Sequence, residues 1–388
     1  MAHSPHTAQL PSPPADALAL SERLRGVIAA EIERGGGWLP FARYMELALY
    51  SPGLGYYMAG ARKLGRDGDF VTAPEISSLF GRTLARQVAQ LAELGLDEIL
   101  EIGAGSGALA ADLLLELDRL GRAPRRYLIL ELSPDLRDRS RDTLAARAPR
   151  LLERVAWLNR LPPAFTGVVI GNEVLDAMPT HVFQRAGQDL LEMGVVVADG
   201  NFQWAPRPPE FPPGTPDPSW FPADGYRSEV QLIARAFIHS LGGALARGVA
   251  LFLDYGVPRR EYYHPQRAGG TLMCHYRHRA HDDPFFLPGL QDITTHIDFS
   301  SIAEAGREAG LDPLGYTNQA QFLVNCGITD VLGETSAEDA VAYAPLAAQA
   351  QKLLSPAEMG ELFKVIALGR GVTSPLRGFS SGDRSHTL

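Results

Sequence analysis

The sequence is poor in cysteine and has no long apolar run. Its 388 residues include only Cys274 and Cys326, too few for a disulfide framework or a cysteine-based zinc site. No apolar run reaches the roughly 18 residues that cross a bilayer, and the first twenty residues lack the basic and apolar regions of a secretion signal. We therefore expect no membrane insertion and a cytoplasmic location, with the mitochondrial matrix as the equivalent in a eukaryote.

The sequence also lacks an excess of positive charge. Its 36 Lys and Arg stand against 45 Asp and Glu, which gives a formal net charge of −9. This balance argues against a general nucleic-acid surface and leaves cationic substrates open. The apolar fraction of 45% is that of a globular protein with a sizeable core.

What the sequence does contain is an alternation of strand-like and helix-like segments from residue 97 onward. Such alternation implies right-handed crossovers and an α/β fold with a parallel, doubly wound sheet. The predicted strands are 98–102, 125–132, 155–159, 165–172 and 250–256, and the predicted helices between them include 108–120 and 134–147.

Shifts in composition divide the chain into five expected parts. Both ends are rich in small and polar residues, which is typical of flexible tails. We expect tails at 1–18 and 371–388 and a helical N-terminal region at 19–95 that contributes one loop to the functional site. The main domain is expected at 96–330, with insertions at about 180–230 and 257–300. A helical segment is expected at 331–370.

The strongest local signal is the string LEIGAGSGAL, residues 100–109. Gly103, Gly105 and Gly107 follow a predicted strand and precede a predicted helix. Glycines there let the backbone turn tightly and approach a ligand at the N-terminus of the helix. The context favours nucleotide binding over a turn that serves only packing, and the spacing also satisfies the dinucleotide pattern.

Three features favour S-adenosylmethionine as the nucleotide. Glu101 lies two residues before the first glycine, where a carboxylate can receive the ammonium group of the ligand. Glu131 ends the second strand, where a carboxylate can accept both ribose hydroxyls; the alternative is a charge at the start of the next helix. The third feature is a polar cluster after the fourth strand. A nicotinamide dehydrogenase remains an alternative, because it would share Glu131.

That cluster is GNEVLDAMP, residues 171–179, which places Asn172, Glu173 and Asp176 at the end of a buried strand. The end of this strand lies across the crevice from the glycine loop, where a methyl acceptor must sit. An amide and a carboxylate there can orient a nitrogen nucleophile. Alternatively, Asp176 turns the chain before Pro179 and Asn172 satisfies loose backbone groups. We predict no metal site, because a hard cation needs more oxygen ligands than this segment supplies.

A histidine-rich stretch lies in the second expected insertion. His275, His278 and His281 recur every three residues beside two aspartates. This spacing is not that of a closed zinc site, and a solvated or substrate-covering loop fits it better.

Several strings together resemble one family, the MidA family, also described as the mitochondrial complex I assembly methyltransferases with bacterial relatives. The match runs in consistent order over most of residues 20–330. It is carried by GRDGDFVTAPEISSLFG (65–81), LEIGAGSGALAADLL (100–114), ELSPDLR (131–137), GNEVLDAMPTHVF (171–183), FLDYG (252–256), GTLMCHYRHRAHDDPF (270–285) and QDITTHIDF (291–299).

The resemblance implies a class I methyltransferase with a Rossmann-like doubly wound sheet, a helical N-terminal part and insertions over the crevice. It implies S-adenosylmethionine as cofactor and arginine N-methylation of a protein substrate, with a complex I subunit as the candidate. By position, the residues implied at the cofactor are Glu101, Gly103, Gly105, Gly107 and Glu131, with Asp69, Thr72 and Pro74 on a loop near that pocket; Asn172, Glu173 and Asp176 fall on the motif after the strand.

An arginine acceptor agrees with the chemistry of these residues. A guanidinium is a planar fork of donors that a carboxylate can hold bidentately. We expect Glu173 to take this role, with Asp176 as its helper and Asn172 as a support. His296, with Asp292 and Asp298, is expected to complete the site or take a released proton. The alternatives are methylation of a small molecule, of a nucleic acid or of another protein group, and an assembly protein that binds the cofactor without turnover.

Overall fold

The computed structural model describes residues 10–59, 72–211 and 216–388. The chain divides into two compact units. The N-terminal unit contains the described parts of 1–70 with 176–235 and 259–298, and the central-sheet unit contains the described parts of 71–175 with 236–258 and 299–388. Among the described residues, no helix has both the length and the apolar character needed to cross a membrane.

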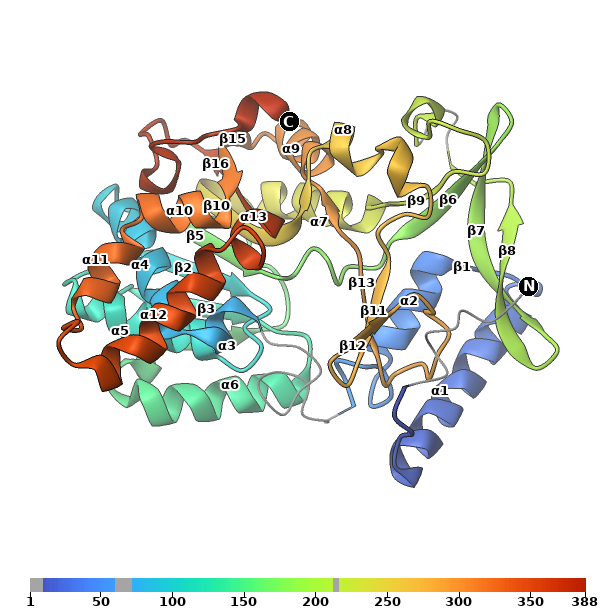
Figure 1. Cartoon of the computed structure of the whole chain (residues 1–388), viewed down its shortest axis with the longest axis horizontal. Coiled ribbons are helices and arrows are strands. Elements are labelled where there is room, and N and C mark those ends of the chain that lie inside the picture. The colour runs from blue at the N-terminus through green and yellow to red at the C-terminus, as the bar shows by residue number, and fades with distance from the viewer. Residues whose placement is uncertain (1–9, 60–71, 212–215) are drawn as a thin grey trace. The chain divides into compact units, whose positions relative to one another are not determined.

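The central-sheet unit is built on a sheet with the strand order β4-β3-β2-β5-β10-β16-β15 (Figure 1). Strands from β4 to β10 in this order run parallel, and β16 and β15 are antiparallel. The expected doubly wound α/β fold is confirmed, and its topological switch point lies between β2 and β5, where such folds bind ligands. The strands are β2 (Glu98–Ile102), β3 (Arg126–Leu130), β4 (Val155–Leu158), β5 (Phe165–Asn172), β10 (Leu245–Val257), β15 (Asp312–Asn318) and β16 (Phe363–Arg370).

Helices of this unit approach one another closely where glycine permits it. A Cβ atom on Gly81 of α4 would lie 2.5 Å from the Cβ of Asp112 on α5. The two helices can therefore pack with little separation, and both contribute to the buried apolar core. The helices are α3 (Ala73–Ile76), α4 (Ser78–Glu93), α5 (Ala108–Arg119), α6 (Pro134–Arg147), α9 (Phe299–Glu308), α10 (Gln319–Asn325), α11 (Ile328–Gly333), α12 (Ala340–Leu354) and α13 (Met359–Leu362), while α7 (Leu232–Ala244) crosses the boundary of the units.

The N-terminal unit contains two antiparallel sheets, one with the order β1-β7-β6-β9 and β8 beside β7, the other with the order β12-β11-β13. Helices α1 and α2 supply much of its core. The elements are α1 (Ala15–Arg34), β1 (Leu39–Pro40), α2 (Phe41–Tyr50), β6 (His181–Ala186), β7 (Asp189–Ala198), β8 (Asn201–Arg207), β9 (Arg227–Val230), α8 (Arg259–Tyr262), β11 (Met273–Tyr276), β12 (Arg279–His281), β13 (Asp292–Thr294) and β14 (Ile297–Asp298).

Three segments differ from the expectation. Residues 257–300 contain the sheet of β11, β12 and β13 where an irregular loop was expected, because β11 pairs with β12 across a short turn and with β13 from further along the chain. The segment 331–370 was expected to be helical but ends in β16, whose apolar residues are buried between β10 and β15. Residues 371–388 were expected to form a flexible tail; Phe379 is instead buried against Phe322, with ring centroids 5.5 Å apart.

Candidate active site

The glycine loop joins β2 to α5 at the switch point of the sheet. Gly103, Gly105 and Gly107 have φ angles of 67°, 53° and 82°, a left-handed region that other residues seldom adopt. A Cβ on Gly107 would also lie 2.8 Å from the backbone of Ser140 on α6. The first two glycines therefore shape the loop, and the third also lets two helices meet.

Glu131 connects the glycine loop to the loop that follows β3. It follows β3, and its carboxylate accepts hydrogen bonds from the backbone N–H groups of Ser133, at 2.9 Å, and Gly105, at 3.3 Å. Burial raises the pKa of Glu131, and these hydrogen bonds only partly offset that effect. The carboxylate is thus fixed between the two loops.

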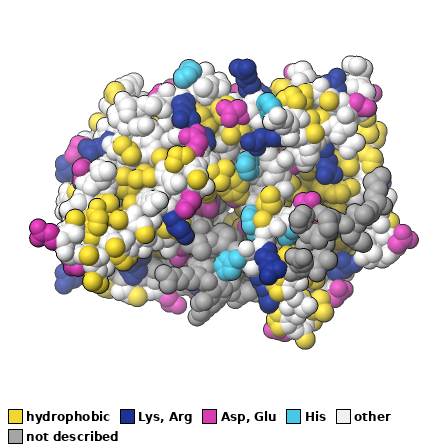
Figure 2. Space-filling model, viewed as in Figure 1, with side chains coloured by type: hydrophobic (Ala, Val, Ile, Leu, Met, Phe, Trp, Pro, Cys, Tyr) yellow, Lys and Arg dark blue, Asp and Glu magenta, His cyan; other side chains and the backbone are white. Residues whose placement is uncertain are grey.

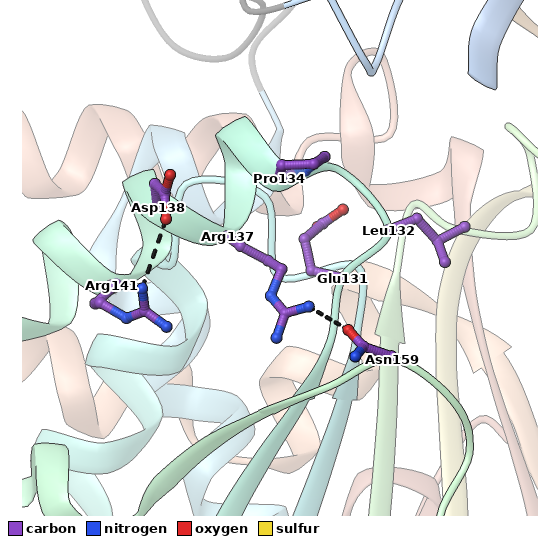
Figure 3. Close-up of a pocket in the computed structure, with 7 residues that line it drawn as sticks. All are labelled: Glu131, Leu132, Pro134, Arg137, Asp138, Arg141 and Asn159. Carbon is purple, nitrogen blue, oxygen red and sulfur yellow. Dashed lines mark hydrogen bonds and ion pairs between the residues drawn. The ribbon is translucent and has the colours of Figure 1, made fainter. Parts of the chain in front are cut away.

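A pocket of about 510 Å³ opens beside Glu131 (Figure 3). Leu132 is 65% exposed there and offers an apolar surface next to the carboxylate. Across the pocket, Arg137 donates a hydrogen bond to Asn159, and Arg141 pairs with Asp138. The pocket thus brings together a carboxylate, an apolar side chain and an amide, a combination typical of small-molecule sites.

Glu101 lies on β2 and is almost completely buried. The hydroxyl of Tyr127 on β3 donates a hydrogen bond of 2.7 Å to its carboxylate. Burial raises the pKa of Glu101 to about 7, with the Tyr127 bond acting in the opposite direction and Glu131 adding to the rise. A buried carboxylate of this kind can stabilise a nearby cation, such as the ammonium of a bound ligand.

Helix α3 links the glycine loop to the end of β5. Ser106 in the loop donates a hydrogen bond to Glu75 on α3, and the backbone N–H of Ala73 donates to Glu173 at 3.4 Å. Thr72 precedes α3 and Pro74 lies in its first turn, so both belong to this linking segment. The predicted Asp69 lies outside the described residues. Sequence reasoning did not assign Glu75 or Ser106, although both lie in the quoted strings.

The end of β5 brings Asn172 and Glu173 together. The Nδ2 group of Asn172 donates to the Glu173 carboxylate at 3.1 Å. Because a carboxylate accepts but cannot donate, this contact fixes the amide orientation. The other amide atom, Asn172 Oδ1, is buried and finds no hydrogen-bond partner among the described residues. Glu173 itself has a left-handed φ of 53°, which is uncommon for a residue with a side chain.

The other predicted acceptor residues belong to the N-terminal unit. Asp176 is buried, and its carbonyl accepts a hydrogen bond from the N–H of Thr295. The backbone carbonyl of His296 accepts a hydrogen bond from the side-chain Nε2 of Gln231. The ring Nδ1 of His296 lies 3.5 Å from Nη1 of Arg267. Asp292 accepts from Tyr57 at 2.9 Å, and Asp298 pairs with Arg259.

The three histidines of the second insertion do not converge. His275 and His281 lie on paired strands, and His278 lies in the turn between them with a φ of 61°. Burial lowers the pKa of His281. Within the described part of the chain, no group of three or more His, Cys, Asp or Glu side chains is arranged to hold a metal ion.

These features define the class of the protein. The chain has a doubly wound sheet, a glycine loop at its switch point and a fixed carboxylate after the neighbouring strand. This is the architecture in which α/β proteins bind nucleotide cofactors. The polar end of β5, with Asn172 and Glu173, belongs to the same unit.

Comparison with known proteins specifies the class. A family model of S-adenosyl-L-methionine-dependent methyltransferases matches residues 79–317. The mouse protein named protein arginine methyltransferase NDUFAF7, mitochondrial, is 31% identical over 373 residues, which cover 86% of this chain and 81% of the mouse protein. The human protein of the same name is 29% identical over 368 residues, which cover 86% and 80%.

A solved structure is more similar still. It is the crystal structure of a COG1565 superfamily member from Burkholderia thailandensis, described as a methyltransferase and bound to S-adenosyl-homocysteine. It is 54% identical, covers 98% of this chain and 100% of its own, and superposes with a TM-score of 0.95. The chain belongs to this family of S-adenosylmethionine-dependent methyltransferases, and S-adenosylmethionine is its cofactor, which confirms the MidA resemblance.

Proposed function

We propose that the protein methylates an arginine nitrogen of a protein substrate. The observation that carries the proposal is the pair of acceptors at the end of β5. Glu173 presents a carboxylate, and Asn172 presents a buried amide oxygen with no partner among the described residues. Both groups accept N–H donors, and a guanidinium is the side chain richest in such donors. The relatives named protein arginine methyltransferases support the same substrate class.

In this proposal Glu173 holds the guanidinium and directs one nitrogen. When bound, S-adenosylmethionine supplies a methyl group on a positively charged sulfur. A new N–C bond forms as the C–S bond breaks, and the methylated nitrogen gives up one proton, which Glu173 accepts first before it passes to water. Positioning contributes most to such a displacement, so fixing the nitrogen is the main task of the carboxylate. Asn172 supports it, and the helper roles of Asp176 and His296 remain predictions from the sequence.

The cofactor is proposed to rest on the residues of the glycine loop and its neighbours. Glu131 receives the ribose hydroxyls, and Glu101 faces the ammonium. Gly103, Gly105 and Gly107 shape the loop, and Thr72 and Pro74 hold the adjoining segment. A complex I subunit, reached from the cytoplasm of a bacterium, is the proposed target, because the family resemblance implies it.

Transfer of labelled methyl groups tests the substrate class. The protein is incubated with methyl-labelled S-adenosylmethionine and lysate from cells that lack it, and labelled protein is hydrolysed to amino acids. We expect the label in methylarginine. Label in a small molecule, a nucleic acid or another amino acid would contradict the proposal. Cofactor binding without any transfer would favour an assembly protein. Purified complex I from the same cells tests the proposed target.

Substitution of the carboxylate tests the role of Glu173. Glu173→Gln keeps the size of the side chain but removes its charge, so we expect transfer to fall by roughly 100-fold or more with the cofactor affinity unchanged. Glu93→Gln is the control, because Glu93 is 58% exposed and pairs only with Arg122 in the described structure. Full activity of Glu173→Gln in the labelling experiment would show that the assignment is wrong.

A further inference from the structure

The loop after β5 is attached to the neighbouring strand β10 on both sides of Glu173. The two strands pair in parallel, with Asn172 opposite Leu253. The N–H of Glu173 donates to the carbonyl of Leu253 at 2.8 Å. Two residues further on, the N–H of Leu175 donates to the side chain of Asp254 at 2.9 Å. The backbone of Glu173 is therefore held before and after its left-handed turn.

Asp254 makes the second of these attachments with a buried carboxylate. Asp254 and Leu175 are both only 1% exposed to solvent. One carboxylate oxygen accepts from Leu175, and the other accepts from the N–H of Tyr255 at 2.9 Å. Hydrogen bonds to a charged acceptor are stronger than those between neutral groups. Without this carboxylate, the N–H of Leu175 would lose the partner that it has in the folded protein.

The conformation of Glu173 explains why such a support is needed. A residue with a side chain in the left-handed region costs about 1 kcal/mol relative to the ordinary conformations. It persists only where the surrounding structure determines it. Leu253 and Asp254 supply that restraint from one strand, so they also determine where the Glu173 side chain starts.

We propose that Asp254 is a positioning residue for methyl transfer. It acts through Glu173, by fixing the turn that presents the carboxylate, and it does not contact either substrate. This inference rests on the proposed role of Glu173. It adds a residue that the sequence patterns left unassigned, although Asp254 lies in the string FLDYG.

Kinetics of Asp254→Asn test the proposal. This substitution keeps the size and one acceptor oxygen but weakens the hold on Leu175. We expect the initial rate at saturating S-adenosylmethionine to fall roughly 10- to 100-fold. The cofactor dissociation constant from calorimetry should stay within about twofold, because Glu101 lies on β2 and Glu131 follows β3, whereas Asp254 lies on β10. Asp112→Asn is the control: Asp112 is similarly buried and pairs with Arg147, so its loss should lower stability but leave the rate of folded protein unchanged.

Hydrogen exchange gives a second readout that does not depend on activity. In Asp254→Asn we expect faster amide exchange in the peptide 171–178 and unchanged exchange in 103–107. If Asp254→Asn does not fold, Asp254→Glu, which keeps the charge and shifts the oxygens, replaces it in both experiments. Unchanged amide exchange at 171–178 would overturn the proposal. A methyl-transfer rate equal to that of the wild type would also overturn it. So would a loss of cofactor affinity large enough to explain the whole fall in the rate.

The two proposals fail in different ways. If Glu173→Gln is inactive and Asp254→Asn is fully active, the positioning role of Asp254 is wrong and the proposed function stands. If Glu173→Gln is fully active, or the wild-type protein transfers no methyl group, the proposed function fails. Exchange at 171–178 then still decides whether Asp254 holds the turn.

Discussion

Glu101 is the residue whose surroundings have the clearest consequence for pH dependence. Its pKa of about 7 lies well above the ordinary 4.5, chiefly because the carboxylate is buried. Folding therefore favours the protonated form. The stability that this form contributes is complete below about pH 4.5 and is lost as the pH rises through about 7.

We predict that ionisation of Glu101 lowers the free energy of unfolding by about 2–3 kcal/mol between pH 5 and pH 8. Glu101→Gln cannot ionise and should remove this part of the pH dependence. Urea denaturation of both proteins at several pH values measures the difference. If the two proteins lose stability in parallel over this range, the raised pKa of Glu101 is not the cause.

At the scale of elements, α3 has only four residues but contacts two parts of the candidate site. It contacts the glycine loop through Glu75 and the end of β5 through the backbone of Ala73. Ser106 also accepts a hydrogen bond from the N–H of Ala108, at the start of α5. One hydroxyl group thus connects the start of α5 to α3.

We predict that Ser106→Ala weakens cofactor binding several-fold. Loss of a hydrogen bond to a charged group costs roughly 1.5–3 kcal/mol, and we expect only part of this free energy to affect the glycine loop. Glu75→Gln removes the same contact from the other side. Calorimetry with S-adenosylmethionine on the two single variants and the double variant gives the coupling between them. Purely additive effects would show that the hydrogen bond between Ser106 and Glu75 does not support the glycine loop.

Strand β16 shows how an element was missed. The residues KVIALG read as a short apolar run at the end of a helical region, and such a run alone does not distinguish a buried helix from a strand. In the structure β16 lies between β10 and β15 and pairs with both. Its β-branched Val365 and Ile366 were the available signal.

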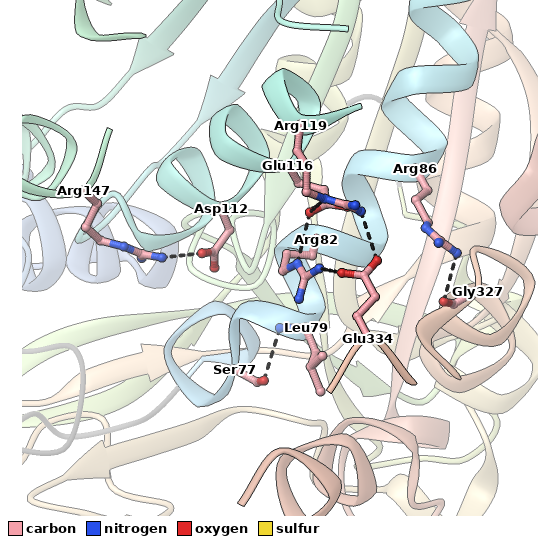
Figure 4. Close-up of polar contacts among 10 residues, drawn as sticks. All are labelled: Ser77, Leu79, Arg82, Arg86, Asp112, Glu116, Arg119, Arg147, Gly327 and Glu334. Atoms are coloured by element: carbon pink, nitrogen blue, oxygen red, sulfur yellow. Dashed lines mark hydrogen bonds and ion pairs between the residues drawn. The ribbon is translucent and has the colours of Figure 1, made fainter. Parts of the chain in front are cut away.

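At the scale of the whole molecule, the C-terminal residues are an integral part of the central-sheet unit. Arg82 on α4 and Arg119 on α5 share Glu116, and both also pair with Glu334 after α11 (Figure 4). Burial alone would raise the pKa of Glu116, but its hydrogen bonds from the two arginines hold it below the usual value. The segment after β16 also bonds to α4, where the side-chain Oε1 of Gln87 accepts a hydrogen bond from the backbone N–H of Gly378.

Helix α12 contributes differently. Figure 2 shows apolar side chains gathered over α12 on the visible face. Val341, in the first turn of this helix, is 88% exposed. The buried residues of α12 are Ala350 and Leu353. The helix is therefore attached mainly by its C-terminal half. Elsewhere in this unit, residues 371–388 contribute Phe379, which packs against Phe322 of α10.

We predict that Phe379→Ala destabilises the protein by about 3–5 kcal/mol, the usual cost of emptying a buried aromatic site. The matched control Phe379→Leu keeps most of the apolar volume and should cost far less. Thermal unfolding of both variants measures the effect, and cofactor binding of the folded proteins should not change. Melting of Phe379→Ala at the wild-type temperature would mean that the segment is the loose tail that its composition indicated.

The sequence alone determined those features that depend on neighbouring residues. The alternation of apolar segments predicted β2 and β5 at the residues where they lie, and the glycine spacing predicted the loop between β2 and α5. The roles of Glu173 and Asp176 at the acceptor, and that of His296, remain predictions, and two of these residues belong to the N-terminal unit.

Only the tertiary structure decided how distant segments meet. The strand order, the place of β16, the left-handed turn at Glu173 and the partners of Glu75 and Asp254 all depend on contacts between residues far apart in the chain. The raised pKa of Glu101 has the same origin, because burial is a property of the packed protein and not of the residues beside it. A local pattern fixes which side chains are available, but long-range pairing fixes their neighbours, and the neighbours determine their chemistry.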